Sequence, residues 1–200
     1  MTSLKTFTIT WDEFVSLAFQ LAFLIESHKP MCHWLGPYEE NENTCSIARL
    51  YRTIFEGKLS SLLISLAANL RILEDRGIIS GALVGTPEAI KIDPKASRVY
   101  QNGVGRIRRD SSDWEDLQTL RDLLNTIMHS ERIDFAVSVI EEHETGRKVM
   151  GFDDIVVVSE AKQKGKGQKT VELRLQNFSR YLFDIVEEMQ PTFSMSTETE

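Results

Sequence analysis

The sequence predicts an α+β fold: mainly an antiparallel helical bundle, with a small three-stranded antiparallel sheet before the C-terminal helix. Apolar residues recur with the 3.6-residue period of a helix in four segments, 10–29, 45–77, 112–131 and 177–190. Between the third and fourth segments the period changes to two, which is typical of strands. At 200 residues the chain has the size of one domain.

The first helix is expected over 10–29. Thr10 and Glu13 form the pattern of a capping box, in which side chains bond the free backbone N–H groups of a first helical turn. Its wide apolar face predicts burial against the rest of the protein. Pro30 is expected to end this helix, and the Gly, Pro and Asn residues of 30–44 predict a loop.

The second helix, over 45–77, has the strongest helical pattern in the chain. Gly57 is a point at which it can divide or kink, and Gly77 is placed like a C-cap. Arg71 and Asp75 stand four residues apart and can pair, and Glu74 or Asp75 can hold Arg121 or His129 if the helices pack antiparallel. The segment 78–110 has no sustained period, which predicts an irregular insertion with at most a small hairpin.

The third helix is expected over 112–131, with Ser112 and Glu115 as a second capping box. The strand-like segments 133–143, 152–161 and 169–176 then predict a meander over about 133–176. Asn177 is expected to cap the last helix. The domain then covers 1–190, and the polar tail 191–200 is expected to be disordered.

Composition limits the functional class. The net charge is −7, no apolar run approaches the roughly 20 residues of a membrane span, and the N-terminus has no secretion-signal pattern. The two cysteines cannot form a disulfide framework. A cytoplasmic protein without membrane contact is expected, and any RNA contact has to be local.

One polar ridge carries candidate chemistry. Arg121, Asn125 and His129 recur at intervals of four on the third predicted helix. An imidazole can act as general acid or base, a guanidinium can stabilise a phosphate, and an amide can orient either. Together they would suit RNA cleavage through the ribose 2′-hydroxyl, which needs no metal. The alternative is a surface histidine beside a helix C-terminus, with the other two residues in structural hydrogen bonds.

The segment "LRDLLNTIMHSERI" (120–133), after a helix ending in "LAANLRILEDR", resembles the HEPN superfamily of toxins, antiviral defence RNases and RNA-processing factors. The resemblance implies a helical bundle that commonly dimerises through the motif helix, and a metal-independent endoribonuclease of a defence or toxin system. It assigns His129 as the acid or base and Arg121 as the phosphate stabiliser, with Asn125 as their polar companion. It equally allows a non-catalytic HEPN-like module for dimerisation or partner binding.

Seven residues separate Arg121 from His129, one more than the usual maximum of the family pattern, so the two side chains diverge by about 80° on one helix. A second subunit could bring Arg121 of one chain towards His129 of the other. Alternatively, Arg132, three residues beyond the histidine, could supply the positive charge.

Further arginines are candidates for holding a substrate. Arg106, Arg108 and Arg109 in "GRIRR", together with Arg132, are expected to contact phosphates. The basic stretch "KQKGKGQK" (162–169) could do so too, although both stretches equally fit solvated turns. The possible zinc ligands are His28, Cys32, His33 and Cys45, and their spacing fits none of the paired arrangements of a zinc site. The sequence contains no nucleotide-binding loop and no serine nucleophile motif. No metal or cofactor is expected. The expected partners are a second copy of the chain, RNA, and a protein partner such as an antitoxin.

Overall fold

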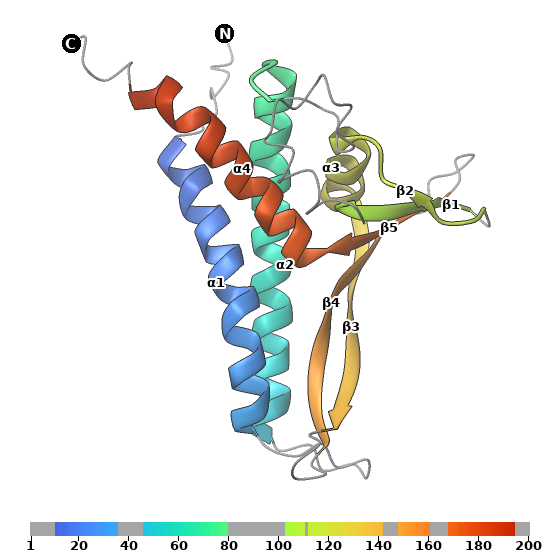
Figure 1. The fold of residues 1–200 in the computed structure, drawn as a ribbon. Helices are drawn as coiled ribbons and strands as arrows, with labels where there is room; N and C mark the ends of the chain where they lie inside the picture. The colour runs from blue at the N-terminus through green and yellow to red at the C-terminus, as the bar shows by residue number, and fades with distance from the viewer. Residues whose placement is uncertain are drawn as a thin grey trace, which may run out of the picture.

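The computed structural model describes residues 11–35, 46–79, 103–110, 112–141, 148–160 and 168–194. These residues form four helices and a five-stranded antiparallel sheet (Figure 1). In chain order the elements are α1 (Trp11–Leu35), α2 (Ser46–Asp75), β1 (Gly105–Arg109), β2 (Glu115–Asp116), α3 (Leu120–Met128), β3 (Ser130–Glu141), β4 (Lys148–Glu160), β5 (Lys169–Arg174) and α4 (Leu175–Ser194). The predicted α+β class is confirmed.

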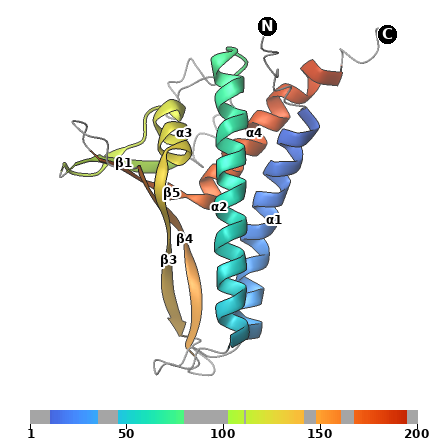
Figure 2. The same cartoon turned by 180° about the vertical axis from the view of Figure 1, so that it is seen from behind.

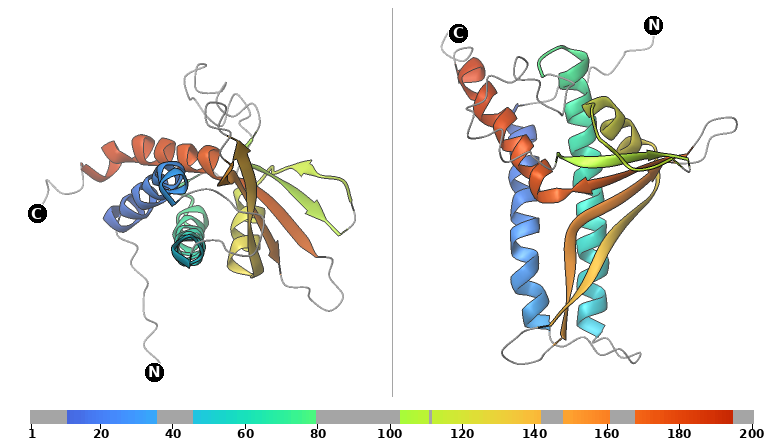
Figure 3. Two further views of the ribbon diagram at one scale, coloured as in Figure 1. Left: turned by 90° about the horizontal axis from the view of Figure 1, so that it is seen from below. Right: turned by 45° about the vertical axis from the view of Figure 1, so that its right-hand side comes forward.

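The helices lie to one side of the sheet, and none of the described helices covers its other face (Figure 3). The strand order is β2-β1-β5-β4-β3. The long helices α1 and α2 run antiparallel, α4 crosses α1, and α3 packs between α2 and the upper end of the sheet (Figures 1 and 2). The predicted helical bundle is therefore wrong. The helices bury their apolar faces against a sheet rather than only against one another.

One continuous hydrophobic core joins the helix layer to the inner face of the sheet. Every second residue of the central strands points into it, as the period of two requires. The sheet contributes Ile107, Val156, Val158, Val171 and Leu173. This apolar face is the physical reason for the layered arrangement, because strands with one apolar face need a cover. α1, α3 and α4 supply it by packing on β4 and β5, and α2 contributes the contact of Phe55 with Phe135 of β3.

The predicted meander of β3, β4 and β5 is confirmed, but the sheet has two further strands. β1 lies in the segment expected to be irregular and pairs antiparallel with β5, placing Ile107 beside Val171. β2 pairs with β1 over two residues, in the stretch expected to begin a helix. The remainder of the predicted insertion, 80–102, lies outside the described residues.

The third helix begins later than predicted. Its N-cap is Thr119, whose hydroxyl accepts a hydrogen bond from the backbone N–H of Asp122, and α3 has only nine residues. Ser112 instead lies in the turn between β1 and β2, where its backbone N–H donates to the carbonyl of Arg109. The observed N-cap stands seven residues after the predicted one, because the pairing of β1 with β2 holds the stretch between them outside the helix.

The other helix ends correct several expectations. Two helices continue through a proline, α1 past Pro30 and α4 past Pro191, although a proline inside a helix removes a backbone hydrogen bond and crowds the preceding turn. The tail expected from 191 therefore begins within α4. Thr10 and most of the predicted loop, 36–44, lie outside the described residues.

α2 is one uninterrupted helix through Gly57 and ends as predicted at Gly77. Gly77 has a φ of 68° and donates its N–H to the carbonyl of Glu74, while Ile78 donates to Leu73. This is the Schellman arrangement, which satisfies two of the last carbonyls of a helix and favours glycine at the left-handed position.

The start of α4 is fixed by β4 rather than by Asn177. Both carboxylate oxygens of Asp154 accept from the backbone N–H of Gln176, at 3.0 and 3.1 Å. Asp154 stands where the pairing of β3 with β4 shifts register, so the irregularity turns this side chain towards the helix end. The Asn177 amide instead donates to the carbonyl of Gly103 at 2.8 Å.

His28 is a buried histidine in α1. Only 5 % of it is exposed, its ring packs on Phe55, and its Nδ1 lies 3.0 Å from the Tyr51 hydroxyl. Burial lowers the pKa of this imidazole to about 4. It is thus neutral in the folded protein at neutral pH.

The lowered pKa of His28 predicts a pH-dependent stability. In the unfolded chain the imidazole has its ordinary pKa of 6.5. As the pH falls, the unfolded state therefore binds a proton before the folded state does, and the free energy of unfolding decreases. The contribution of His28 should be complete above pH 6.5 and should fall by about 3 kcal/mol as the pH falls to 4. Urea unfolding at pH 7.5, 6 and 4.5 measures this loss. The variant His28→Gln should show a flatter profile over that range, and an unchanged profile would contradict the assignment.

Candidate functional site: the end of α3 and the outer face of the sheet

The three residues of the predicted ridge have different surroundings. Arg121 is bonded to the end of α2: its Nε donates to Glu74 at 3.1 Å, and its terminal nitrogen contacts Asp75. The hydrogen bond to Glu74, more than any other contact, raises the pKa of this guanidinium. The sequence left open whether the acids ending α2 hold Arg121 or His129, and in the structure they hold Arg121.

Asn125 is also turned towards α2. Its side-chain oxygen accepts from Arg71 at 2.9 Å, and Arg71 in turn pairs with Asp75 at 3.0 Å, as predicted from their spacing. The hydrogen bond from Arg71 is the main cause that lowers the pKa of Asp75. Arg121 and Asn125 therefore join α3 to α2.

His129 stands apart from this network. It is the exposed C-cap of α3, and its backbone N–H donates to the carbonyl of Asn125 at 3.0 Å. Within the described part of the chain, its imidazole makes no hydrogen bond to Arg121 or Asn125. β3 begins at the next residue, so His129 stands at the end of the sheet where Arg132 also lies.

The four arginines predicted to hold a substrate are divided between the two faces of the sheet. Arg106 and Arg108 alternate with the buried Ile107 and so lie on the outer face, away from the helices. Arg132 lies on the same face, because paired residues of neighbouring strands share a face. Arg132 pairs with Ser159, Ser159 with Thr170, and Thr170 with Arg108. Arg109 is on the inner side, where it pairs with Asp122 and Glu115 at 3.2 Å each.

We call the first row of this outer face the arginine line. It takes one residue from each of four neighbouring strands, in the order Arg108, Thr170, Ser159 and Arg132. It carries two cations and no carboxylate. Within the described residues, the hydroxyls of Thr170 and Ser159 make no hydrogen bond. The two side chains between the cations are therefore polar and can bind a ligand.

The second row, which we call the mixed row, is acidic. It contains Asp116, Arg106, Glu172, Val157 and Asp134. Arg106 donates to both carboxylate oxygens of Glu172, with its terminal nitrogen 2.8 Å from each. Because this forked pair neutralises Arg106, the cations that remain available to an anion in these two rows are those of the arginine line.

Trp114 covers the two arginines of β1 that lie on the outer face, Arg106 and Arg108. The guanidinium carbons of Arg108 and Arg106 lie 4.9 and 5.6 Å from its ring centroid. A cation over an aromatic face is attracted and held in one orientation. Arg108 makes no ion pair in the described part of the chain, and its buried Nε has no hydrogen-bond partner there. Among these arginines, Arg108 is therefore positioned by stacking rather than by an acid.

Arg132 is the most accessible cation of the line. Its side chain is 74 % exposed and pairs with Asp134 at 2.7 Å across two positions of β3. An ion pair this exposed contributes little, because water and salt screen it. An anion of higher charge can therefore compete with Asp134 for this guanidinium.

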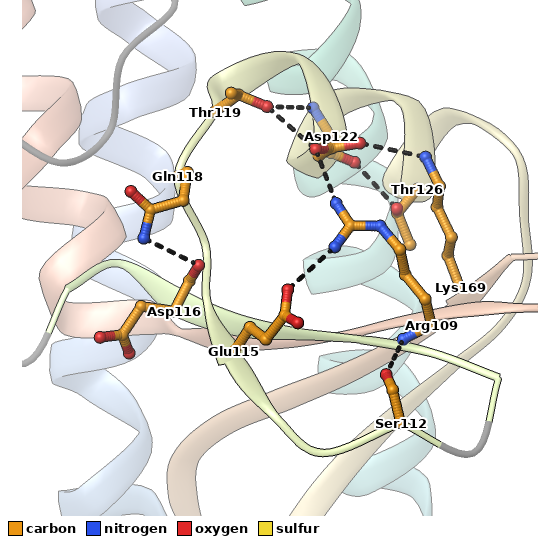
Figure 4. A network of polar contacts seen from close by, with 9 residues as sticks. All are labelled: Arg109, Ser112, Glu115, Asp116, Gln118, Thr119, Asp122, Thr126 and Lys169. Carbon is orange, nitrogen blue, oxygen red and sulfur yellow. Dashed lines mark hydrogen bonds and ion pairs between the residues drawn. The ribbon is translucent and has the colours of Figure 1, made fainter.

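A separate network fixes α3 against the sheet (Figure 4). The Asp122 carboxylate accepts from Lys169 of β5 at 3.0 Å and from Arg109 of β1 at 3.2 Å. Burial acts to raise the pKa of Asp122, but the hydrogen bond from Lys169, with its charge and those of nearby groups, holds that pKa below its ordinary value. Arg109 thus serves the fold, and the network keeps the sheet end beneath His129 in place.

Three residues of the outer face were not among the predicted site residues: Trp114, Ser159 and Thr170. The alternation in "GRIRR" was a usable signal, because it predicts two arginines on one face of a strand. The partners on β4 and β5 depend on pairing between distant segments, which no local pattern reveals.

The described residues contain no cluster of three or more His, Cys, Asp or Glu side chains able to hold a metal ion. The side chains of Cys32, His33 and Cys45 lie outside the described part. None of the helices within the described ranges is long and apolar enough to cross a membrane. Comparison with protein-family models, with curated proteins and with solved structures found no match to this chain.

Proposed function

We propose that this protein binds RNA on the outer face of its sheet. The observation that carries the proposal is the arginine line, where Arg108 and Arg132 share one face without a carboxylate in their row. Arginine is the side chain best suited to phosphate, because its planar fork donates two parallel hydrogen bonds. Contact at two phosphates also fits a protein of net charge −7, in which RNA binding has to be local.

The proposal predicts that Arg108→Ala weakens RNA binding about tenfold. One charge-assisted contact to a phosphate contributes on the order of 1.5 kcal/mol, which corresponds to that factor. Fluorescence anisotropy with a labelled mixed-sequence RNA measures the Kd at several salt concentrations, and the salt dependence should also decrease by about one counterion.

Arg180→Ala is the matched control for this variant. Arg180 is exposed on α4 and is not part of the sheet, so its removal changes the net charge equally without touching the outer face. An equal loss of affinity in both variants would show that binding depends on total charge, and the outer face would then not be the RNA site.

A second candidate function is cleavage of the bound RNA, as the resemblance to the HEPN superfamily implies. The observation that favours it is the exposed His129 at the end of α3, three residues before Arg132 of the arginine line. In this candidate His129 is the acid or base. The phosphate charge is stabilised by Arg132, or by Arg121 if it exchanges Glu74 and Asp75 for the substrate. Asn125 would position His129 through its backbone carbonyl, which accepts a hydrogen bond from the backbone N–H of His129.

A further inference from the structure

The arginine line has the form of a path across the strands rather than of a single anion pocket. Its residues come from β1, β5, β4 and β3, so three gaps between strands separate Arg108 from Arg132. At about 4.8 Å per gap, the two Cα positions lie roughly 14 Å apart. That distance matches a few nucleotides of an extended strand and exceeds the size of one phosphate.

The residues between the two cations add a chemical preference. Thr170 and Ser159 stand next to each other on β5 and β4, and each hydroxyl can both donate and accept a hydrogen bond. A ribose 2′-hydroxyl has the same two capacities, and it is the group by which proteins distinguish RNA from DNA. The hydroxyls thus suit riboses that lie between two phosphates bound at Arg108 and Arg132.

The mixed row restricts where such a strand can lie. Glu172 and Asp134 are neighbours of Thr170 and Arg132 along their strands, two residues away on the same face. Their carboxylates repel phosphates, so the strand is confined to the arginine line. An RNA duplex presents two backbones over a wide surface and would bring one of them over these acids.

We propose that the arginine line binds single-stranded RNA, with phosphates at Arg108 and Arg132 and riboses at Thr170 and Ser159, and that Trp114 positions Arg108 for this contact. This inference rests on the proposed function, because it names the substrate class of the same face. Trp114 acts through the guanidinium on which it stacks.

The test compares three labelled probes of one sequence, a single-stranded RNA, a single-stranded DNA and an RNA duplex. The wild-type protein should bind the single-stranded RNA about fivefold more tightly than the DNA and more tightly than the duplex. Thr170→Val keeps the branched shape that a strand favours and removes the hydroxyl, so it should reduce the preference for RNA over DNA and leave the DNA affinity unchanged.

The role of Trp114 is tested by a pair of variants. Trp114→Leu should weaken binding of both single-stranded probes several-fold, and Trp114→Phe should restore most of the affinity because it keeps an aromatic face for Arg108. Thermal unfolding of each variant confirms that it is folded. If leucine and phenylalanine give the same affinity at equal stability, the positioning role is wrong.

The outcomes separate this inference from the proposed function. Failure of all three probes to bind would overturn both. Binding of the duplex as tightly as the single strand, still lost in Arg108→Ala, would leave the RNA-binding function in place and overturn the single-stranded path. Equal affinity for RNA and DNA would overturn the assignment of Thr170 and Ser159 to riboses.

Discussion

Gly105→Ala is expected to destabilise the protein by about 3 kcal/mol, although it adds only one methyl group. A Cβ at this position of β1 would lie 2.3 Å from the carbonyl oxygen of Glu172 and 3.3 Å from the Cα of Leu173. Both are backbone atoms of β5, which cannot turn away as a flexible side chain can. The methyl group therefore has to push β1 away from β5.

The consequences extend beyond the one contact. The Gly105 carbonyl accepts from the N–H of Leu117 at 3.0 Å, and the neighbouring Val104 carbonyl accepts from Arg174 at 2.9 Å. A displaced β1 loses these hydrogen bonds or strains them, and it carries Arg108 away from Thr170. The variant should therefore also bind RNA more weakly, to the extent that β1 is displaced.

Urea unfolding followed by circular dichroism measures the change, with Gly57→Ala as the matched control. No atom lies within 4 Å of the Cβ that this substitution would add in the middle of α2, and alanine is the better helix former, so the control should gain about 0.5 to 1 kcal/mol. A change below 0.5 kcal/mol in Gly105→Ala would contradict the close packing of β1 on β5.

Local pattern predicted the parts of the fold in which sequence neighbours decide the structure. The alternation of Val156 with Val158 and of Val171 with Leu173 predicted two central strands, because strand side chains alternate between the faces of a sheet. Gly77 was predicted to end a helix because glycine readily adopts the left-handed conformation that most other residues avoid. The structure shows this conformation at Gly77.

The parts that were wrong depend on distant pairing. β1 was expected to be irregular, and its strand conformation is fixed by β5, which follows more than sixty residues later at the pair Arg108 and Thr170. The capping box of Ser112 and Glu115 is a local pattern only. The pairing of β1 with β2 overrides it, and the expected helix loses its first eight residues.

The same distinction holds for the candidate site. Spacing correctly predicted that Arg71 pairs with Asp75, because residues four apart are neighbours on one helix. The contact of Arg121 with Glu74 and Asp75 was one of several alternatives, because it depends on how α3 packs on α2. Spacing also suggested that Arg121 and His129 act together, yet on this short helix the guanidinium turns to α2 and His129 stands at the far end as the C-cap, through its backbone N–H. Arg132 shares a face with Arg108 only through four paired strands, which no single segment encodes.

His129→Ala is expected to lower the rate of RNA cleavage at least a hundredfold if the second candidate function is correct, the range of a lost general acid or base. In the reaction the ribose 2′-oxygen attacks the adjacent phosphorus as its proton is removed. The bond from phosphorus to the 5′-oxygen breaks, and that oxygen takes up a proton. The products would carry a 2′,3′-cyclic phosphate and a 5′-hydroxyl, which gel mobility and end-labelling identify.

The assay uses single-stranded RNA with excess chelator and compares the wild type with His129→Ala, Arg132→Ala and Arg121→Ala. RNA affinity is measured in parallel, and it should be unchanged in His129→Ala because the imidazole lies outside the arginine line. A greater loss of rate in Arg132→Ala than in Arg121→Ala, at equal RNA occupancy, would identify Arg132 of β3 as the residue that stabilises the phosphate charge. Arg121→Ala should chiefly lower stability, since Arg121 joins α3 to Glu74 and Asp75.

An unchanged cleavage rate in His129→Ala would exclude this residue as the acid or base. RNA binding without cleavage by the wild type would favour the non-catalytic module, in which the outer face holds RNA and the end of α3 is free for a partner. The distinction is physical, because binding requires only the fixed charges of Arg108 and Arg132, whereas cleavage requires a titratable group at the phosphate. His129 is the exposed imidazole that the described residues place at that end of the sheet.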